Sequence, residues 1–302
     1  DLDTANKIRS KKLPGVEFEE GYQRFYPNND MASHLLGFVN SDGVGQYGIE
    51  AFYNDDLTGK SGRIYKTADG GRRQVPTGET RVYDASDGLS AVLTIDQEIQ
   101  SYAEEEASKI MEEFNADGVQ IIVEDVKSGE ILAMVSNPNY NNNDPASPVN
   151  GSQKRAWEKM SPQEIQNDWF DNWSNKAVNY IYEPGSTFKL ITTAAAIEEN
   201  ETNPNEHYYC SGYIRDIKGA PVIKCVNHNL GDLTLTEALE RSCNSTMVYV
   251  ARDLGREKFV KYIEGFGFGA PTGIDLKGEL SGLIPKNPEN ISEISLATMS
   301  YG

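Results

Sequence analysis

A change of pattern near residue 88 limits the folds that this chain can adopt. The residues before it are rich in Gly, Asp and Tyr and hold short extended runs, and a turn cluster at 84–88 ends them. Strand-like runs and then a mainly helical stretch follow, without a regular alternation of strand and helix. This order indicates an α+β fold and argues against a doubly wound parallel sheet. We therefore expect one module over residues 1–87 and a mixed domain over residues 88–302.

The clearest secondary-structure signals come directly after this change. Residues 89–95 alternate like a strand, and Asp96 caps a helix predicted over residues 97–114. Residues 118–126 and 129–135 are two further strand-like runs that a tight turn would join as a hairpin. The apolar face predicted for the helix consists of Ile99, Tyr102, Ala103, Ala107, Ile110 and Met111.

The second half of the chain is less regular at first and then helical. We interpret the stretch that holds the tryptophans as an irregular segment, with aromatic side chains as its buried anchors: Trp157, Trp169, Phe170 and Trp173. A helix is predicted to open at residues 183–186 and to run to about Glu199. Residues 236–254 read as two helical pieces that break near residues 242–244.

The segment Ser186-Thr-Phe-Lys189 carries the strongest chemical signal. A Ser and a Lys at positions i and i+3 share one face of a helix, so the amine can approach the hydroxyl. Serine is a weak nucleophile that needs a base, and a lysine can be that base when burial and a helix N-terminus lower its pKa. Phe188 and Leu190 beside the lysine supply apolar surroundings, and the helix start points backbone N–H groups at Ser186 as an oxyanion hole requires.

A second motif makes the catalytic interpretation more specific. A chain of this length holds about one Ser-x-x-Lys by chance, with Ser186 as a plain N-cap and Lys189 as a surface residue. Ser242-Cys-Asn244 lies 56 residues further on and occurs once. Its serine can relay a proton and its asparagine can hold both a lysine and a substrate amide, although the same residues also suit a helix-breaking polar turn. The two motifs in this order are much more specific than either alone.

With both motifs, the chain resembles the penicillin-binding proteins of class B. These are monofunctional transpeptidases, and the resemblance is to the type that acts in cell division or sporulation. The resemblance rests on the nucleophile segment 183–189, the second motif with Ala238-Leu239, and landmark residues of the preceding strands and helix. The landmarks are Leu93–Asp96 with Ile99-Gln100, Asp125–Met134 and Asn137-Pro138. The N-terminal part resembles the family's pedestal in Arg24–Pro27, Ala32–His34 with Leu36–Phe38, and Gly45 with Gly48–Glu50 and Tyr53. The resemblance therefore covers nearly the whole chain.

The resemblance implies a fold and a mechanism. The fold is that of the penicillin-binding proteins and serine β-lactamases, an antiparallel sheet with a helical subdomain, preceded by a pedestal of the dimerisation type. Ser186 would attack the penultimate carbonyl of a D-alanyl-D-alanine stem peptide while Lys189 takes the serine proton. Ser242 would shuttle that proton, and Asn244 would hold the peptide amide. An amine of a second stem peptide would resolve the acyl-enzyme into a peptidoglycan cross-link, and a β-lactam would acylate Ser186 and stay.

One element of the family pattern is missing. The family has a third motif, Lys-Thr/Ser-Gly, which should follow the second one, but no such sequence occurs after Asn244. Residues 60–62 and 127–129 read Lys-Ser-Gly, but both lie before Ser186, and residues 127–129 form the predicted hairpin turn. We expect the chain to be cut before the third motif and to be catalytically incomplete by itself. We also expect a membrane anchor, an N-terminal helix absent from this sequence, that holds the native protein at the outer face of the bacterial cytoplasmic membrane.

The charge narrows the choice of partners. The chain has 28 Lys+Arg and 46 Asp+Glu, a formal net charge of −18. Nucleic acid needs a basic surface, so it is excluded as the main ligand. The resemblance implies a membrane glycosyltransferase of the wall-synthesis machinery as a partner, and a homodimer as a further possibility. The alternatives to a transpeptidase are a penicillin-sensing or β-lactamase-type acyl-serine protein, or an inert scaffold in a wall-synthesis complex.

The cysteines suggest a separate site. Cys210, Cys225, His228 and Asp232 are acceptable zinc ligands, with His207 and Asp216 as substitutes for the aspartate. A Cys210–Cys225 disulfide and unpaired thiols are the competing interpretations. The family resemblance favours a metal in this region, while catalysis itself requires no cofactor. Two residues are read as structural: Cys243 as a small buried residue inside the second motif, and His34 in the N-terminal module.

Overall fold

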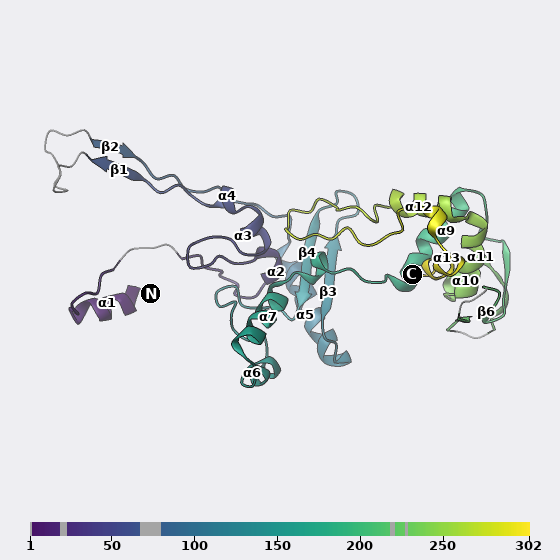
Figure 1. The fold of residues 1–302 in the computed structure, drawn as a ribbon, viewed down its shortest axis with the longest axis horizontal. Helices are drawn as coiled ribbons and strands as arrows, with labels where there is room; N and C mark the ends of the chain where they lie inside the picture. The colour runs from purple at the N-terminus through teal and green to yellow at the C-terminus, as the bar shows by residue number, and fades with distance from the viewer. Residues whose placement is uncertain (1, 19–22, 67–79, 218–220, 227–228) are drawn as a thin grey trace. The chain divides into compact units, whose positions relative to one another are not determined.

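The computed structural model describes residues 2–18, 23–66, 80–217, 221–226 and 229–302 (Figure 1). It divides into two compact units. Unit 1 comprises Asp1–Val178 with Asp275–Lys277, and unit 2 comprises Asn179–Ile274 with Gly278–Gly302. In the described ranges, no helix combines the length and the apolar character that crossing a membrane requires.

Unit 1 contains short helices, two antiparallel hairpins and one long helix. In chain order its elements are α1 (Leu2–Ser10), α2 (Ser33–Leu36), α3 (Gly48–Phe52), α4 (Asn54–Leu57), β1 (Arg63–Lys66), β2 (Thr80–Tyr83), α5 (Gln97–Phe114), β3 (Val119–Glu124), β4 (Ile131–Asn137), α6 (Gly151–Trp157) and α7 (Pro162–Trp173), with α8 (Lys176–Asn179) at the division between the units. Strand β1 pairs with β2, and β3 pairs with β4.

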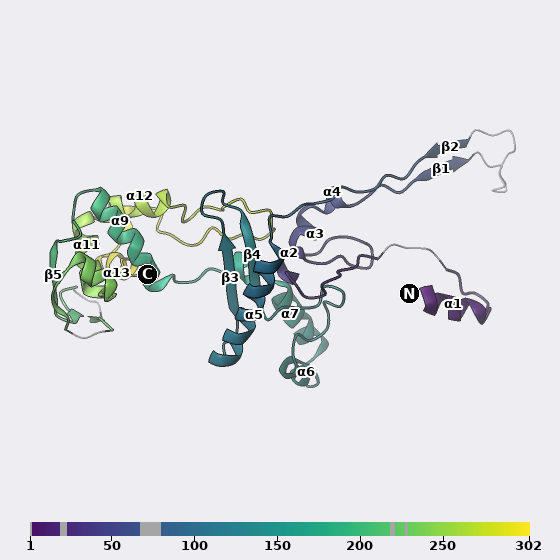
Figure 2. The ribbon, with the colours of Figure 1, turned by 180° about the vertical axis from the view of Figure 1, so that it is seen from behind.

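Helix α5 packs along the β3–β4 hairpin (Figures 1 and 2). The side chain of Asp96 accepts hydrogen bonds from the backbone N–H groups of Glu98 and Ile99, which confirms the predicted cap. The buried face of α5 differs from the prediction, because Tyr102 is 69% exposed whereas Gln100 is fully buried. The Gln100 amide exchanges two hydrogen bonds with the backbone of Met134 in β4, so a polar residue joins the helix to the sheet at a position that an apolar pattern does not reveal.

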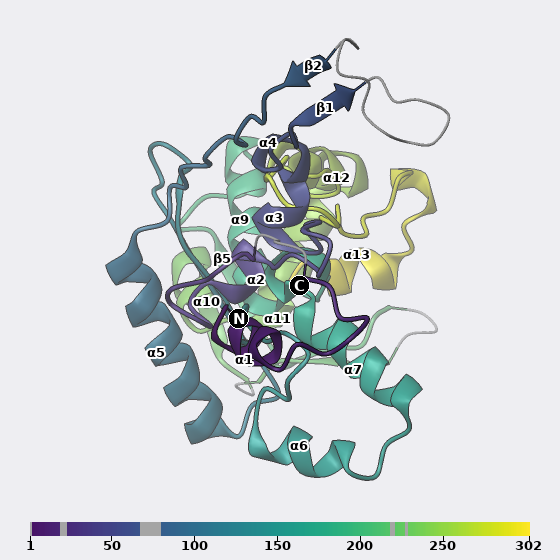
Figure 3. The same cartoon turned by 90° about the vertical axis from the view of Figure 1, so that its left-hand side faces the viewer.

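Two local predictions in this unit are wrong. Residues 89–95 form no strand. The hydrogen bonds from Thr94 Oγ1 to Ile131 O and from the following Asp96 N–H to Leu132 O join this segment to β4. The tryptophan-rich stretch is helical, and α6 and α7 follow one another as separate helices (Figure 3). A capping box between Ser161 and Glu164 starts α7, a signal that is visible in the sequence and that the aromatic content obscured.

The N-terminal elements and residues 88–178 form one unit because polar contacts join them. The carboxylate of Glu104 in α5 accepts a hydrogen bond from the backbone of Ala32, at 2.7 Å. The amide of Asn142 donates to the carbonyls of Ser33 and Gly37. The compact unit therefore extends past residue 87, and the domain boundary expected there stays a prediction.

Unit 2 is a helical bundle with two short antiparallel ribbons. Its elements are η1 (Gly185–Phe188), α9 (Lys189–Glu198), β5 (His207–Cys210), β6 (Tyr213–Ile214), β7 (Ile223–Lys224), β8 (Gly231–Thr234), α10 (Leu235–Glu240), α11 (Asn244–Leu254), α12 (Arg256–Gly265), η2 (Pro288–Asn290) and α13 (Glu293–Met299). The predicted break between two helical pieces is confirmed by the gap between α10 and α11. Strand β5 pairs with β8, and β6 pairs with β7.

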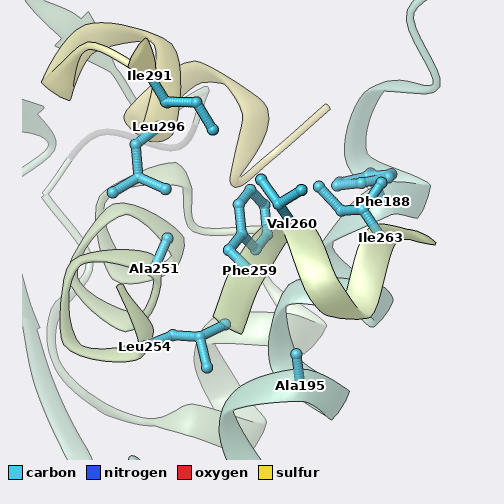
Figure 4. Packing of buried hydrophobic residues seen from close by; sticks show 9 residues of the cluster. All are labelled: Phe188, Ala195, Ala251, Leu254, Phe259, Val260, Ile263, Ile291 and Leu296. Carbon is cyan, nitrogen blue, oxygen red and sulfur yellow. The ribbon is translucent and has the colours of Figure 1, made fainter. Parts of the chain in front are cut away.

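The main apolar core of unit 2 joins α9, α11, α12 and α13 (Figure 4). It consists of Phe188, Ala195, Ala251, Leu254, Phe259, Val260, Ile263, Ile291 and Leu296. Phe188 belongs to the same turn as Ser186, and its ring meets Phe259 edge to face. The packing of this core therefore fixes the position of the turn that carries the candidate nucleophile.

Candidate active site

The turn that carries Ser186 is a short 3₁₀ helix that continues into α9. Gly185 begins it with φ of +64°, a left-handed conformation that glycine adopts without strain. The side chain of Thr187 donates to the carbonyl of Pro184 at 2.8 Å and closes the turn. Ser186 is exposed, while Phe188 and Lys189 are buried. The hydroxyl can therefore meet a ligand from solvent while the lysine behind it is kept away from water.

Lys189 is a cation buried in full among polar acceptors. Its side chain is 1% exposed, and Nζ lies 2.8 Å from both the carbonyl O and the Oγ of Ser242 and 2.7 Å from Oδ1 of Asn244. Three acceptors match the three donors of an ammonium group. This saturation explains how a charged group is tolerated in the interior.

Ser242 connects the lysine to the nucleophile. Its Oγ lies 3.1 Å from Oγ of Ser186, so a continuous chain of hydrogen bonds runs from Lys189 through Ser242 to Ser186. Ser242 has φ of +53°, an uncommon conformation for a residue other than glycine. Such backbone strain persists where the surrounding structure holds it, often at functional sites.

Asn244 is the first residue of α11 and ties a ribbon to the site. Its Oδ1 accepts from Lys189, and its Nδ2 donates to the backbone carbonyl of Lys224 in β7 at 3.1 Å. The structure thus brings together all four residues that the two motifs predicted: Ser186, Lys189, Ser242 and Asn244.

The electrostatics of the lysine suit a base. Burial is the main cause that lowers the pKa of Lys189 from its usual value, and it is opposed by the nearby thiols of Cys243 and Cys225. A lowered pKa increases the fraction of neutral amine at a given pH. In that state the hydrogen-bond chain can run in the opposite direction, with Ser186 donating to Ser242 and Ser242 donating to Lys189. The arrangement can therefore move a proton from Ser186 to Lys189 over two short steps.

A cluster of three thiols lies directly behind this site. Sγ of Cys225 lies 3.6 Å from Sγ of Cys210 and 3.7 Å from Sγ of Cys243, and all three side chains are buried. All three cysteines are free. The sequence analysis read Cys243 as a small buried residue, and it is buried, but its place in the cluster was missed. The sequence spacing of Cys243 from Cys210 and Cys225 matches no common metal-binding motif, because β8 and α10 lie between Cys225 and Cys243.

Hydrogen bonds polarise the thiols. Cys225 Sγ accepts from the backbone N–H of Ser245 and lies 3.1 Å from its hydroxyl. The contact with Cys243 is the main cause that lowers the pKa of Cys225, and the same contact raises the pKa of Cys243. The cluster geometry fits zinc, because three sulfurs of a tetrahedral site with Zn–S bonds of about 2.3 Å lie about 3.8 Å apart.

The other predicted metal ligands are placed differently. Asp232 is not part of the cluster: its carboxylate is exposed and lies 2.9 Å from Nδ1 of His207, because it projects from the opposite face of the β5–β8 ribbon to the buried Cys210. Asp216 pairs with Arg252. Asp232 and its expected substitutes His207 and Asp216 therefore lie outside the thiol cluster of the described residues, and the metal site stays a prediction. His228 lies outside the described residues.

The sequence matches two family models. Residues 119–302, more than half of the chain, match the penicillin binding protein transpeptidase domain. Residues 2–93 match the penicillin-binding protein dimerisation domain. The two matches follow one another in the order that the sequence analysis predicts.

Curated relatives and solved structures agree with these matches. The chain is 34% identical over 301 residues to stage V sporulation protein D of Bacillus subtilis and covers 43% of it. It is 29% identical over 301 residues to the peptidoglycan D,D-transpeptidase FtsI of Escherichia coli and covers 46% of it. Both alignments include 99% of this chain, which thus spans less than half the length of these relatives.

A solved structure shares the fold. Penicillin binding protein 3 from Mycobacterium tuberculosis, complexed with aztreonam, superposes with a TM-score of 0.71 at 26% identity, over 92% of this chain and 54% of that one. The predicted α+β fold, with a dimerisation-type module ahead of a transpeptidase domain, is confirmed. The chain therefore belongs to the class B penicillin-binding proteins.

Proposed function

We propose that the natural protein is a serine-type peptidoglycan D,D-transpeptidase that cross-links stem peptides through an acyl-enzyme on Ser186. One observation carries the proposal: the unbroken hydrogen-bond chain Ser186–Ser242–Lys189, with distances of 3.1 and 2.8 Å. It joins an exposed hydroxyl to a buried amine of lowered pKa, as an activated serine requires.

Each residue has one role in the proposed reaction. Ser186 Oγ attacks the carbonyl carbon of the D-alanyl-D-alanine bond, and its proton passes through Ser242 to neutral Lys189. The proton then goes to the nitrogen of the departing D-alanine, which leaves an ester on Ser186. The amine of a second stem peptide attacks the ester carbonyl, so that the cross-link amide forms as the C–O bond to Ser186 breaks. The proton of that amine passes by way of Lys189 and Ser242 to the departing Ser186 Oγ, which restores the free serine. Asn244 holds Lys189 in place and presents its amide beside the site.

The same chemistry predicts the action of β-lactams. The strained ring presents an amide carbonyl to Ser186, and opening of the ring keeps the leaving nitrogen attached to the acyl group. The aztreonam complex of the Mycobacterium tuberculosis protein supports this class of ligand.

The proposal is tested by labelling the natural full-length protein with a fluorescent penicillin. We expect covalent label on the parent and none on Ser186→Ala. Ser281→Ala is the matched control, because it removes an exposed serine hydroxyl elsewhere in unit 2 and keeps Ser186, and it should still be labelled. Equal labelling of Ser186→Ala would refute the assignment. Rapid release of hydrolysed drug would favour a β-lactamase, and a folded parent without label would favour an inert scaffold.

We also propose where the natural protein works and with what partner. The two matched modules and the relatives named for sporulation and peptidoglycan transpeptidation support a wall-synthesis protein at the outer face of the cytoplasmic membrane. A membrane glycosyltransferase would supply the glycan strands whose stem peptides are cross-linked. Co-purification of such an enzyme with the full-length protein from membranes tests this pairing, and its consistent absence would count against it.

A structural zinc at the thiol cluster is proposed as well. Cys210, Cys225 and Cys243 would bind it through their thiolates. The bound zinc would stabilise the fold by linking β5, the end of β7 and the start of α11. Elemental analysis of the purified protein should find about one zinc per chain, and Cys225→Ser should lose it. Asp232→Asn is the matched control and should keep the metal. A parent without zinc would remove this proposal and leave the transpeptidase proposal untouched.

A further inference from the structure

The segment that follows α13 lies against the turn that carries Ser186. A Cβ atom added at Gly302 would come within 3.0 Å of the carbonyl oxygen, the carbonyl carbon and the Cα of Gly185, closer than real Cβ atoms come to backbone. The atoms in the way are main chain, so no side-chain rotation can relieve the overlap. Gly302 also has φ of +96°, where a residue with a Cβ is strained. The two backbones therefore touch because Gly302 lacks a side chain, whereas a Cβ added at Gly185 would meet no atom within 4 Å.

The same segment is fixed to the helix that carries the lysine. Oγ1 of Thr192, one turn after Lys189 in α9, donates to the carbonyl of Ser300 at 2.8 Å. Thr192 and Ser300 are both fully buried, so this hydrogen bond is shielded from water. The Ser300 hydroxyl donates to the carbonyl of Ala297 and closes the last turn of α13.

Helix α13 is itself held by the core of unit 2. Leu296 packs in the main apolar cluster together with Phe188, and Ala297 packs with Val248 of α11. Helix α11 begins at Asn244, so α13 contacts the helix that follows the second motif while its end touches the turn of the first. The segment Ser300–Gly302 is thus braced against both motif-bearing parts of the site.

From this geometry we propose that Gly302 is a positioning residue for the nucleophile, with the Thr192–Ser300 hydrogen bond as its anchor. The backbone at Gly302 supports the carbonyl of Gly185 and so fixes the 3.1 Å separation between Ser186 Oγ and Ser242 Oγ. The inference rests on the proposed role of Ser186, since only a reaction at that hydroxyl depends on its exact position relative to Ser242.

The test measures acylation of the natural full-length protein by a chromogenic cephalosporin. Stopped-flow kinetics separate the dissociation constant of the non-covalent complex from the acylation rate constant. A displacement of about 1 Å at reacting groups lowers rates by about 100-fold, so Gly302→Ala should lower the acylation rate constant by about that factor. The dissociation constant should change less than about threefold, because the variant leaves the binding groups in place.

Matched variants separate positioning from general damage. Gly267 has a similar φ of +90° and open space around its Cα, so Gly267→Ala has the backbone strain without the overlap and should acylate within about twofold of the parent. Thr192→Val removes the anchor and should slow acylation by about tenfold, whereas Thr192→Ser keeps the hydroxyl and should restore the parent rate. The threonine pair gives an answer even where Gly302→Ala does not fold.

The outcomes distinguish this inference from the proposed function. If Ser186→Ala is inert while Gly302→Ala and Thr192→Val acylate at the parent rate, the positioning role is wrong and the transpeptidase proposal stands. Equal losses in Gly302→Ala and Gly267→Ala would also overturn it, because strain alone would then explain the effect. If Ser186→Ala is acylated like the parent, the proposed function itself fails.

Discussion

Each unit of the molecule buries a basic side chain, His34 in unit 1 and Lys189 in unit 2, and the two side chains have different partners. In unit 1, His34 is 5% exposed; its Nε2 lies 2.8 Å from the carbonyl O of Asn172, and its ring meets Tyr140 edge to face. In unit 2, Lys189 is 1% exposed and contacts the side chains of Ser242 and Asn244 beside an exposed Ser186. Burial is the main cause that lowers the pKa of both groups.

This difference shows that a buried group with a lowered pKa is not by itself a site. The partners of His34 are a backbone carbonyl and the hydroxyl of its buried neighbour Ser33, and none of them reaches solvent. The partners of Lys189 form a path to a hydroxyl that solvent can reach. The contacts of the histidine are those of a structural residue, as the sequence analysis expects, whereas the contacts of the lysine support the chemical role that we propose for it.

Replacement of the lysine should give the largest effect. Lys189→Met keeps the length of the side chain and removes the base, so penicillin acylation should fall by about 1,000-fold or more. The melting temperature should also fall, because the acceptors of Ser242 and Asn244 lose the donor that Lys189 supplies, so the rates are compared at a temperature where both proteins are folded. Stopped-flow acylation and thermal melts of the full-length protein check both statements. A variant that acylates within tenfold of the parent would show that another group is the base.

The histidine should instead control stability through pH. Burial lowers the pKa of His34 to about 4, against about 6.5 in an unfolded chain. Between these values the unfolded chain binds more protons, so the free energy of unfolding is highest above pH 6.5 and falls by about 3 kcal/mol as the pH drops toward 4. Urea unfolding across this range measures the slope. His34→Phe should flatten it, and an unchanged slope in that variant would contradict the assignment.

Loss of one buried amide should have a smaller structural effect. Asn142 is 3% exposed and donates to the carbonyls of Ser33 and Gly37. Asn142→Ala removes the Asn142 donor from the buried carbonyl of Gly37, whereas the carbonyl of Ser33 still accepts from Gly37 N–H and from the Tyr140 hydroxyl. The free energy of unfolding should fall by about 2 kcal/mol, while the acylation rate stays that of the parent. The exposed neighbour Asn141 offers the matched control, and Asn141→Ala should lose less than about 1 kcal/mol. Equal losses in both variants would mean that burial of the amide is irrelevant.

The pH dependence of acylation should be the most gradual effect. Only the neutral amine of Lys189 accepts a proton, so the rate should rise about tenfold per pH unit while the pH is below the pKa of the lysine. The rise should level off below pH 10.5, because burial lowers that pKa. Rates measured at constant drug saturation give the profile, with Lys189→Arg as a control that stays slow at every pH. A profile that is flat from pH 5 to 9 in the parent would exclude the lysine as the base.

The proximity of the four candidate catalytic residues could be predicted because each motif is local and marks a helix start. Ser186 and Lys189 are three residues apart, so any helical turn brings them to one face. The polar residues between α10 and α11 predict the helix break at Ser242. The cap at Asp96 was predictable for the same reason. In each case the residues that define the feature are neighbours in the sequence.

Features that depend on contacts between residues far apart in the sequence could not be predicted. Cys243 meets Cys225 only because α11 starts beside β7, and Asp232 falls on the wrong face of a ribbon whose register the sequence does not reveal. Gln100 faces the core because its amide pairs with a strand backbone, against the apolar pattern of its helix. The contact of Gly302 with Gly185 joins residues more than one hundred positions apart.

The central claim is that Ser186 is the nucleophile, activated through Ser242 by Lys189. The most direct measurement is peptide mapping by mass spectrometry of the full-length protein after brief exposure to a penicillin. The account predicts one adduct per chain, on Ser186, that forms about 1,000-fold more slowly in Lys189→Met. An adduct on Ser242 or on another residue, or an adduct on Ser186 that forms at the same rate without the lysine, would contradict it.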